Sequence, residues 1–476
     1  MPASAQAHLR FTPVAALLVA MALLAAAALA PPAGQAQTAQ VSAKPRGALT
    51  QLKGSHGCVT HRTKKATSCA EARALQEPGP FMGSRAIGIS PDGRHVYVAS
   101  SASNAIAVFA RDKRTGRLSQ PSGRNGCIAA GGAQGCAVVV GLARPNSVAI
   151  SPDGRNVYAS ARDSGSIVAF ARNPKTGGLR QLLSGGCISG LALPGCLGGV
   201  ALEGPDVLVV SPDGANVYVG SFFGNAVAVL DRDASSGGLS QPASPAACIA
   251  EANANCSVGI ALGAPEGLAI SSDGTSVYVG SSLSNAVAIL DRDPGTGDLS
   301  QAGDGTGCIV QAALAGCTTG VQLGGANAVA LAPGDGQAYV TSLLSNSVTS
   351  FDRSASTGDL TQKSGTPGCL VYLEAVGCSF GRAMKAPEGI VVAPGGRNVY
   401  AAAFSTGAID VLNRSTETGR VSQKPGRPGC LARKLPGCAR ARALKGVSSL
   451  AVSADGRFVY STAATSNAVG VFRRTK

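Results

Sequence analysis

Short apolar runs alternate with glycine-containing turns along most of the chain, and residues 144–182 show the pattern clearly. The apolar runs in this region cover residues 147–150, 157–160, 167–170 and 179–182. The turns between them lie at Asp153-Gly154, at Ser164-Gly165 and at residues 175–178. Short apolar runs joined by tight turns with glycine at a positive-φ position are typical of antiparallel β-hairpins. The pattern therefore predicts four antiparallel strands.

This four-strand pattern returns about every 60 residues. Its clearest marker is a Ser-Pro-Asp-Gly type of turn, found at residues 90–93, 151–154, 211–214, 271–274 and 453–456, with altered forms at 332–336 and 393–396. Seven tyrosines keep the same spacing: Tyr97, Tyr158, Tyr218, Tyr278, Tyr339, Tyr400 and Tyr460. Seven such repeats predict an all-β fold, a seven-bladed β-propeller with four-stranded antiparallel blades.

The first and last parts of the repeat region complement each other. The seventh repeat runs to residues 471–476 with three expected strands, and lacks the fourth strand and the cysteine pair that the other repeats have. Residues 47–51 and the cysteine pair after them match residues 358–362 and the pair after those. We therefore expect the N-terminal strand to complete the last blade, which leaves no blade edge unpaired.

The 14 cysteines form seven close pairs. The pairs are Cys58 with Cys69, Cys127 with Cys136, Cys187 with Cys196, Cys248 with Cys256, Cys308 with Cys317, Cys369 with Cys378, and Cys430 with Cys438. Zinc sites normally show two-residue spacings and histidine partners, which these pairs lack, except that His56 and His61 lie near the first. We predict one disulfide bond per blade, which is typical of an exported protein.

The first residues have the pattern of an export signal. His8 and Arg10 precede an apolar run at residues 14–30, which is short and rich in alanine for a membrane span. We predict a signal peptide over residues 1–36, a short linker over 37–46 and the propeller over 47–476. The expected protein is secreted or otherwise extracytoplasmic, has no membrane span and is a monomer.

Several segments resemble a known family. Residues 151–158 (Ser-Pro-Asp-Gly-Arg-Asn-Val-Tyr) and residues 108–118 are similar to the lactonase-type propeller family, and Tyr339-Val340-Thr341 resembles the related YVTN-type surface propellers. The resemblance covers nearly all of the expected propeller. Its motifs are turn and strand residues, so they specify a blade and not an activity. The cysteine-bracketed insert departs from the usual lactonase-type repeat.

The seven repeats can be aligned with one another, and residues present in all of them are expected to be structural. One series follows the third strand: Arg111, Arg172, Arg232, Arg292, Arg353, Arg414 and Arg474. Another lies in the fourth strand: Gln51, Gln120, Gln181, Gln241, Gln301, Gln362 and Gln423. We assign both series to blade architecture. The alternative for the arginines is a ring that binds an anionic polymer.

A third aligned position, five residues before each turn, is polar but varies in chemistry. It holds Arg85, Asn146, Asp206, Glu266, Asn327, Glu388 and Ser448. In propellers of this type we expect the position at the mouth of the central channel, where it predicts a ligand site. The oxygen-bearing members Asn146, Asp206, Glu266, Asn327 and Glu388 suit Ca²⁺ or the hydroxyl groups of a sugar or lactone. The alternative is a solvated mouth that simply favours polar residues.

The family resemblance implies His, Glu and Arg side chains at this mouth as base and anion binder. No histidine is available there, because His8 lies in the leader, His95 in a second strand, and His56 and His61 in the first cysteine loop. The catalytic candidates are Glu266 or Glu388 as general base, with Arg85 steadying a carboxylate or an oxyanion. Metal-assisted lactone hydrolysis also stays open, since it needs carboxylate and amide ligands.

The net charge of +15 is concentrated in two segments. One holds Lys53, Arg62, Lys64 and Lys65, and the other holds Arg427, Arg433, Lys434, Arg440, Arg442 and Lys445. Closure of the ring makes the segments neighbours, which predicts a basic sector for an anionic cell-envelope polymer, a carbohydrate or a protein. Incidental charge that aids solubility is the alternative. Nucleic acid is not expected, because the loops lack interleaved aromatic residues.

Seven elaborate loops accompany few catalytic residues, and no nucleophile elbow, phosphate loop or paired zinc motif is present. The sequence therefore favours a secreted binding or surface-interaction protein that acts through its inter-blade loops and channel mouth. The alternative is a lactonase-like hydrolase at the central channel.

Overall fold

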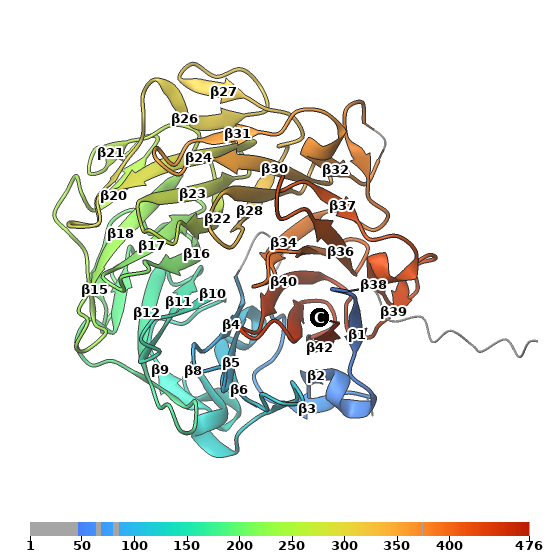
Figure 1. Cartoon of the computed structure of the whole chain (residues 1–476). Coiled ribbons are helices and arrows are strands. Elements are labelled where there is room, and N and C mark those ends of the chain that lie inside the picture. Colours follow the sequence, from blue (N-terminus) through green and yellow to red (C-terminus); the bar gives the residue numbers. More distant parts are fainter. Residues whose placement is uncertain (1–45, 63–67, 80–84, 374, 476) are drawn as a thin grey trace, which may run out of the picture. The chain divides into compact units, whose positions relative to one another are not determined.

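Seven β-sheets succeed one another along the chain and form the blades of a propeller (Figure 1). The computed structural model describes residues 46–62, 68–79, 85–373 and 375–475, all within one compact unit. The predicted all-β, seven-bladed fold is confirmed. The predicted signal peptide (1–36) and all but the last residue of the predicted linker (37–46) lie outside the described residues.

Each blade has three long antiparallel strands. The innermost strands are β4 (Ile87–Ile89), β10 (Pro145–Ile150), β16 (Pro205–Val210), β22 (Pro265–Ile270), β28 (Ala326–Leu331), β34 (Pro387–Val392) and β40 (Val447–Val452). The second strands are β5 (His95–Ser100), β11 (Asn156–Ala161), β17 (Asn216–Ser221), β23 (Ser276–Ser281), β29 (Gln337–Ser342), β35 (Asn398–Ala403) and β41 (Phe458–Ala463). The third strands are β6 (Ala105–Arg111), β12 (Ser166–Arg172), β18 (Ala226–Arg232), β24 (Ala286–Arg292), β30 (Ser347–Arg353), β36 (Ala408–Arg414) and β42 (Ala468–Arg474).

The fourth strand position is divided between two short segments that both pair with the third strand. The first segments are β7 (Leu118–Ser119), β13 (Leu179–Gln181), β19 (Leu239–Ser240), β25 (Leu299–Ser300), β31 (Leu360–Gln362), β37 (Val421–Gln423) and β1 (Leu49–Gln51). The second segments are β8 (Cys127–Ala130), β14 (Cys187–Ser189), β20 (Cys248–Ala250), β26 (Gly305–Val310), β32 (Cys369–Val371), β38 (Cys430–Ala432) and β2 (Cys58–His61). The predicted four antiparallel strand positions are thus confirmed.

A further short strand lies at the outer edge of each blade and runs parallel to its neighbour. These strands are β9 (Ala137–Val139), β15 (Leu197–Gly198), β21 (Ser257–Val258), β27 (Cys317–Thr319), β33 (Ser379–Phe380), β39 (Ala439–Arg440) and β3 (Ala70–Ala72). They follow directly after the second cysteine of each pair, or begin at it in β27, so the disulfide fixes the start of each outer strand to the blade. Sequence reasoning missed them because two or three residues carry no readable periodicity.

All seven predicted disulfides form, with Cα–Cα separations between 4.6 and 4.9 Å. They join Cys58 to Cys69, Cys127 to Cys136, Cys187 to Cys196, Cys248 to Cys256, Cys308 to Cys317, Cys369 to Cys378, and Cys430 to Cys438. The predicted pairing of one disulfide per blade is confirmed, and seven disulfides indicate an oxidising environment.

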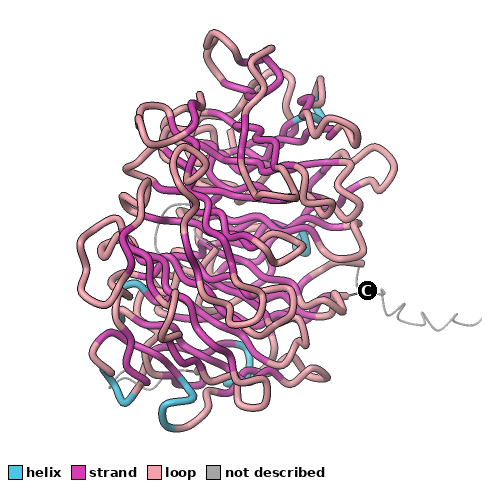
Figure 2. Tube along the Cα trace, turned by 90° about the vertical axis from the view of Figure 1, so that its left-hand side faces the viewer, coloured by secondary structure: helices cyan, strands magenta, loops and turns pink. Residues whose placement is uncertain are grey.

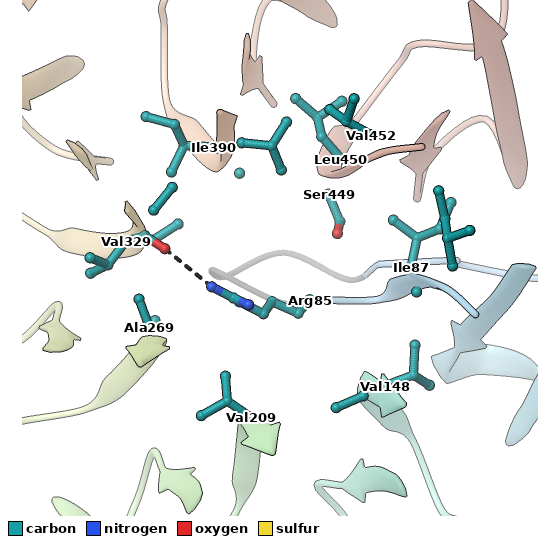
Figure 3. Close-up of a pocket in the computed structure, with 18 of the residues that line it drawn as sticks. Arg85, Ile87, Val148, Val209, Ala269, Val329, Ile390, Ser449, Leu450 and Val452 are labelled. Carbon is teal, nitrogen blue, oxygen red and sulfur yellow. Dashed lines mark hydrogen bonds between the residues drawn. The ribbon is translucent and has the colours of Figure 1, made fainter. Parts of the chain in front are cut away.

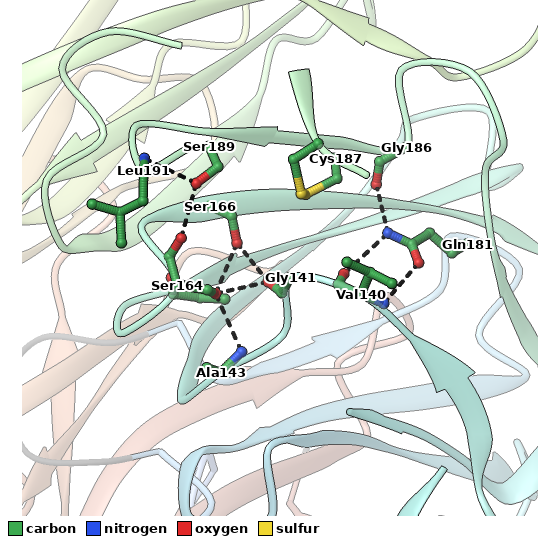
Figure 4. Close-up of a disulfide and its surroundings, with 12 residues drawn as sticks. Val140, Gly141, Ala143, Ser164, Ser166, Gln181, Gly186, Cys187, Ser189 and Leu191 are labelled. Carbon is green, nitrogen blue, oxygen red and sulfur yellow. Dashed lines mark hydrogen bonds between the residues drawn. A yellow bond between two sulfur atoms is a disulfide. The ribbon is translucent and has the colours of Figure 1, made fainter. Parts of the chain in front are cut away.

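The repeated glutamines join neighbouring blades, as predicted for a structural series. Figure 4 shows Gln181 beside the disulfide of Cys187. The Gln181 amide bonds to the backbone of Val140 in the preceding blade and to Gly186 O in its own. Six of the seven glutamines satisfy backbone groups on both sides of a blade boundary, and Gln362 bonds to Val321 of the preceding blade.

The chain closes the ring as predicted. Strands β1 and β2 both pair with β42, with Leu49 opposite Arg474 and Cys58 opposite Gly470. The repeated arginines and tyrosines lock every blade to the next: Arg232 Nε donates to Tyr158 Oη at 2.7 Å, and Tyr158 Oη donates to Gly237 O at 2.9 Å. Equivalent bonds join the last blade to the first through Arg111 and Tyr460.

Helical structure is limited to short 3₁₀ turns (Figure 2, cyan), among the residues that the structure describes. They are η1 (Gly54–Gly57), η2 (Ser101–Ser103), η3 (Gly123–Gly126), η4 (Ala133–Gly135), η5 (Thr366–Gly368) and η6 (Arg427–Gly429). The described residues contain no helix of the length and hydropathy needed to cross a membrane. The apolar cores lie between adjacent blades, as where Tyr97 and Val108 pack with Val157 and Phe170.

Candidate functional site

The innermost strands surround a central cavity of about 570 Å³ (Figure 3). Its wall is mainly aliphatic, with side chains such as Val209 and Ile390, and Arg85 reaches into it. Arg85 Nη2 donates to Val329 O, on a different blade, at 3.2 Å. Partial desolvation inside the cavity lowers the pKa of Arg85 to about 10, although the residue as a whole is exposed, so Arg85 stays charged at neutral pH.

Arg85 is alone among the seven predicted ring residues in lining this cavity. The other six are at most 1% exposed: Asn146, Asp206, Glu266, Asn327, Glu388 and Ser448. The expectation that they line a solvated channel mouth is wrong in this respect. A β-bulge marks the start of their innermost strands, for example between Pro145 and Ser147, and a bulge re-aims the side chain at that point. Their role in ligand binding stays a prediction.

Three of these buried side chains, from three consecutive blades, come together. Asn146 Nδ2 donates to Asp206 Oδ1, and Ser282 Oγ donates to Glu266 Oε1 at 2.6 Å. The charge of Asp206 acts on Glu266 and raises its pKa further. Within the described residues, one oxygen each of Asn146, Asp206 and Glu266 is buried without a hydrogen-bond partner. We call Asn146, Asp206, Glu266 and Ser282 the carboxyl cluster.

The two acids of the carboxyl cluster have raised pKa values. Burial raises the pKa of Asp206 to about 6, although the Arg162 charge and the Asn146 hydrogen bond act in the opposite direction. Burial raises the pKa of Glu266 to about 8, against the hydrogen bond from Ser282. At neutral pH Asp206 is therefore mainly ionised and Glu266 mainly protonated. Two carboxyl groups separated in this way can serve as base and acid in one reaction.

Arg162 completes this region and was missed by sequence reasoning. Its Nη1 lies 3.5 Å from Asp206 Oδ1, and its guanidinium lies over the rings of Phe222 and Phe223 at 4.5 and 4.9 Å. The Arg162 side chain is 18% exposed, against 1% for Asp206, so solvent meets the arginine first. The aligned turn positions in other blades hold Ser101, Phe222, Ser282, Leu343, Phe404 and Ala464. Arg162 is the one charged residue at this aligned position, and this difference was the sequence signal that could have identified it.

The remaining predicted residues do not join the cluster. Both polar atoms of the Asn327 amide have partners, since Nδ2 donates to Pro387 O at 3.1 Å and Oδ1 accepts from Ala328 N and Thr341 Oγ1. Ser448 Oγ donates to Gly79 O at 2.7 Å. Glu388 is buried at the same position of blade six. The residues of the third aligned position therefore lie in separate environments.

The predicted Ca²⁺ site has only part of its ligand set. The orphaned oxygens of Asn146, Asp206 and Glu266 are three, whereas Ca²⁺ takes about six to eight oxygen ligands. Arg162 also places a positive charge beside Asp206. In the part of the chain that the structure describes, no group of three or more His, Cys, Asp or Glu side chains is placed to hold a metal. These residues do not fit a Ca²⁺ ion well.

Ring closure brings the two predicted basic segments together. A groove of about 520 Å³ is lined by Lys53, Arg433, Lys434, Arg440 and Arg442. Arg442 Nη2 donates to Gly54 O at 2.6 Å, across the seam between blades six and seven. Of the other predicted members, Arg62 pairs with Glu71 at 3.3 Å, Arg427 and Lys445 are not among the lining residues, and Lys64 and Lys65 lie outside the described residues. An anionic polymer, carbohydrate or protein partner stays a prediction.

Seven interlocked blades, closed by the N-terminal strand, define the class as a seven-bladed β-propeller. Residues 83–185 match the family model described as Lactonase, 7-bladed beta-propeller. The resemblance to lactonase-type propellers is thereby confirmed over this segment, which includes Arg85, Asn146 and Arg162.

Solved structures share the fold at low sequence identity. Hydrazine synthase of Kuenenia stuttgartiensis is 17% identical, with 83% of this chain and 97% of that chain covered and a TM-score of 0.51. A functionally unknown protein from Desulfotomaculum acetoxidans is 16% identical, with 79% and 91% covered and a TM-score of 0.51. The periplasmic gluconolactonase of Pseudomonas aeruginosa is 18% identical, with 71% and 82% covered and a TM-score of 0.49. No curated protein matches the chain.

Proposed function

We propose that the protein hydrolyses a lactone ring at the carboxyl cluster. The observation that carries this proposal is the pair of buried, electrostatically interacting carboxyl groups of Asp206 and Glu266 on neighbouring blades, whose pKa values are raised to about 6 and about 8. The lactonase family match supports the reaction class and covers two neighbours of the pair, Asn146 and Arg162. The family match favours a hydrolase over the binding role that was expected from the sequence. The binding role stays a prediction.

The two carboxyl groups suit the two proton transfers of ester cleavage. Ionised Asp206 accepts a proton from water as the water oxygen attacks the lactone carbonyl carbon. Protonated Glu266 donates its proton to the ring oxygen as the carbon–oxygen bond breaks. Water is thus added across the ester bond, and the product is the open-chain hydroxy acid.

Arg162 suits the charge that develops on the carbonyl oxygen. Its guanidinium is 3.5 Å from Asp206 and is the more exposed partner, so an entering carbonyl group meets it first. A guanidinium in a partly desolvated position stabilises an oxyanion more strongly than one in water. The Phe222 and Phe223 rings hold this guanidinium from one side.

The test is turnover of a panel of γ- and δ-lactones by the full chain, with Ca²⁺ or with EDTA. We expect hydrolysis that Glu266→Gln reduces by about 100-fold or more, because the variant cannot donate the proton. Glu388→Gln is the matched control, as it makes the same change at the aligned, equally buried position of blade six. Full activity in Glu266→Gln would overturn the assignment. Loss in Glu388→Gln alone would also overturn it.

A further inference from the structure

A repeated ion pair joins neighbouring blades at five of the seven blade boundaries, on the face opposite the carboxyl cluster. The third-strand arginine of one blade binds the turn aspartate of the blade before it: Arg172–Asp92, Arg232–Asp153, Arg292–Asp213, Arg353–Asp273 and Arg111–Asp455. Three of these pairs lie at 2.6 to 2.8 Å. Each arginine is almost fully buried, so its aspartate balances a desolvated charge.

The seam between blades six and seven lacks this aspartate. The altered turn at residues 393–396 has Gly395 at the aspartate position. Arg474 keeps its other bonds, to Tyr400 Oη at 2.8 Å, Gly456 O at 3.1 Å and Asn398 Oδ1 at 2.9 Å. No carboxylate of the described residues lies within ion-pair distance of its guanidinium.

A second carboxylate is missing beside the first. In blade five Lys363 forms an ion pair with Asp352. The aligned residues of blade six are Lys424 and Asn413, and Lys424 Nζ donates to the Asn413 amide oxygen at 2.7 Å. Lys424 is 6% exposed, and both its burial and the charge of Arg474 lower its pKa. A buried lysine thus faces a neutral amide where the aligned lysine of blade five faces an acid.

The two replacements border one pocket of about 630 Å³. Its lining includes Gly395 itself and five cations: Arg46, Arg397, Arg414, Lys424 and Arg474. Glu417 is the one carboxylate among the lining residues. Arg414 also lacks its turn aspartate, because Gly334 holds that position in blade five. The pocket therefore combines open volume with excess positive charge at a place where five of the seven blade boundaries have a turn aspartate.

We propose that this seam pocket binds a small dianion, namely a ligand that carries a phosphate group or two carboxylates, in place of the two missing acids. Arginine and lysine donors that are fixed by other hydrogen bonds lose little freedom when an oxyanion arrives. Arg474 and Lys424 are fixed in this way. The pocket lies at the end of the innermost strands opposite the carboxyl cluster, so the site is separate from the proposed hydrolase.

Calorimetric titration of the full chain with inorganic phosphate and with succinate, at constant ionic strength, tests the proposal. We expect at least one of the two anions to bind at one site per chain with a dissociation constant in the millimolar range or lower. The anion that binds more tightly identifies the class of ligand. Absence of binding by both probes at about 10 mM would overturn the site.

The decisive variant is Gly395→Asp combined with Asn413→Asp, which restores both internal acids. A Cβ atom added to Gly395 would meet no other heavy atom within 4 Å, and the φ of Gly395 is not positive, so this position accepts the side chain. We expect affinity to fall at least tenfold while the melting temperature is kept or raised, because the new carboxylates occupy the cations. Gly395→Asn with wild-type Asn413 is the uncharged control and should retain affinity within about threefold.

A second comparison excludes general attraction by basic surface. The variant Arg433→Ser with Lys434→Ser removes two charges from the other groove and should leave dianion affinity within about threefold. Equal binding by wild type and the double-aspartate variant would overturn the proposal. The proposal would also be overturned if the groove variant lost its dianion affinity and the double-aspartate variant retained it.

Discussion

Two parts of the ring that depart from the sevenfold pattern carry opposite imbalances of charge. In blades two to four, Asp206 and Glu266 are buried, and their pKa values are raised although the charges of Arg162 and Arg144 act on Asp206 in the opposite direction. At the seam of blades six and seven, Arg474 and Lys424 are held without the acids that their counterparts have. The first region has an excess of acidic side chains, and the second has an excess of cationic side chains.

The comparison shows how a repeat builds local chemistry. The Arg–Tyr–Gly bonds recur in every blade, and they hold the ring together wherever a neighbouring charge is replaced. A charge can therefore be added, as at Arg162, or removed, as at Gly395, without loss of the blade. Sites are expected where one blade differs from the other six.

The largest effect is expected from removal of the base in the acid-rich region. Asp206→Asn should lower kcat for lactone hydrolysis by about 100- to 10,000-fold, because an amide cannot accept the proton of water. The acidic limb of the wild-type pH–rate profile, expected near pH 6, should disappear from the residual activity. Asp410→Asn is the control: Asp410 is also buried, and burial raises its pKa to about 7, but it lies in blade six. A comparable loss there would show that any buried carboxyl group has this effect.

The second effect is on stability against pH. Glu266 and Asp206 have higher pKa values in the folded protein than in the unfolded chain, so the folded state binds more protons between about pH 4 and pH 8. Their contribution is present at low pH and is lost as the pH rises through the folded values. The unfolding free energy should fall on the order of a few kcal/mol over this range.

Chemical denaturation at several pH values measures this slope. Glu266→Gln should flatten it between about pH 4.5 and pH 8, because the amide does not titrate. Asp410 adds its own share in the wild type and in the variant alike, so the difference between the two curves isolates Glu266. Identical slopes in wild type and Glu266→Gln would contradict the raised pKa.

The fold was largely predictable because its signals are repeated. The Tyr158 and Arg232 series and the cysteine pairs each occur seven times, and a repeated residue reports a shared structural role. The burial of Asp206 was not predictable, because it depends on a bulge that no residue pattern marks. The glycine at 395 was visible as an altered turn, but its meaning requires the contact between that turn and the arginine of the next blade.

A smaller effect is expected at the basic groove, a second region with excess positive charge. Charge reversal by Arg433→Glu with Lys434→Glu should lower the salt concentration that elutes the protein from an anionic polysaccharide resin, since the groove loses its uncompensated cations. Arg62→Glu is the control, because Arg62 already pairs with Glu71 and is outside the groove. Unchanged elution of the double variant would count against a polyanion at this groove.

The smallest effect is expected where the missing ion pair is restored. Gly395→Asp alone should raise the unfolding free energy by up to about 1 kcal/mol in dianion-free buffer, because Arg474 regains the partner that Arg232 finds in Asp153 at 2.8 Å. Part of the gain comes from replacing a glycine, which restricts the unfolded chain. Gly395→Asn carries that second contribution without the charge, so the difference between the two variants measures the ion pair. The difference should shrink as phosphate is added, since a bound dianion stabilises the asparagine variant more than the aspartate variant. If the difference in unfolding free energy does not change with phosphate, phosphate does not bind at Arg474.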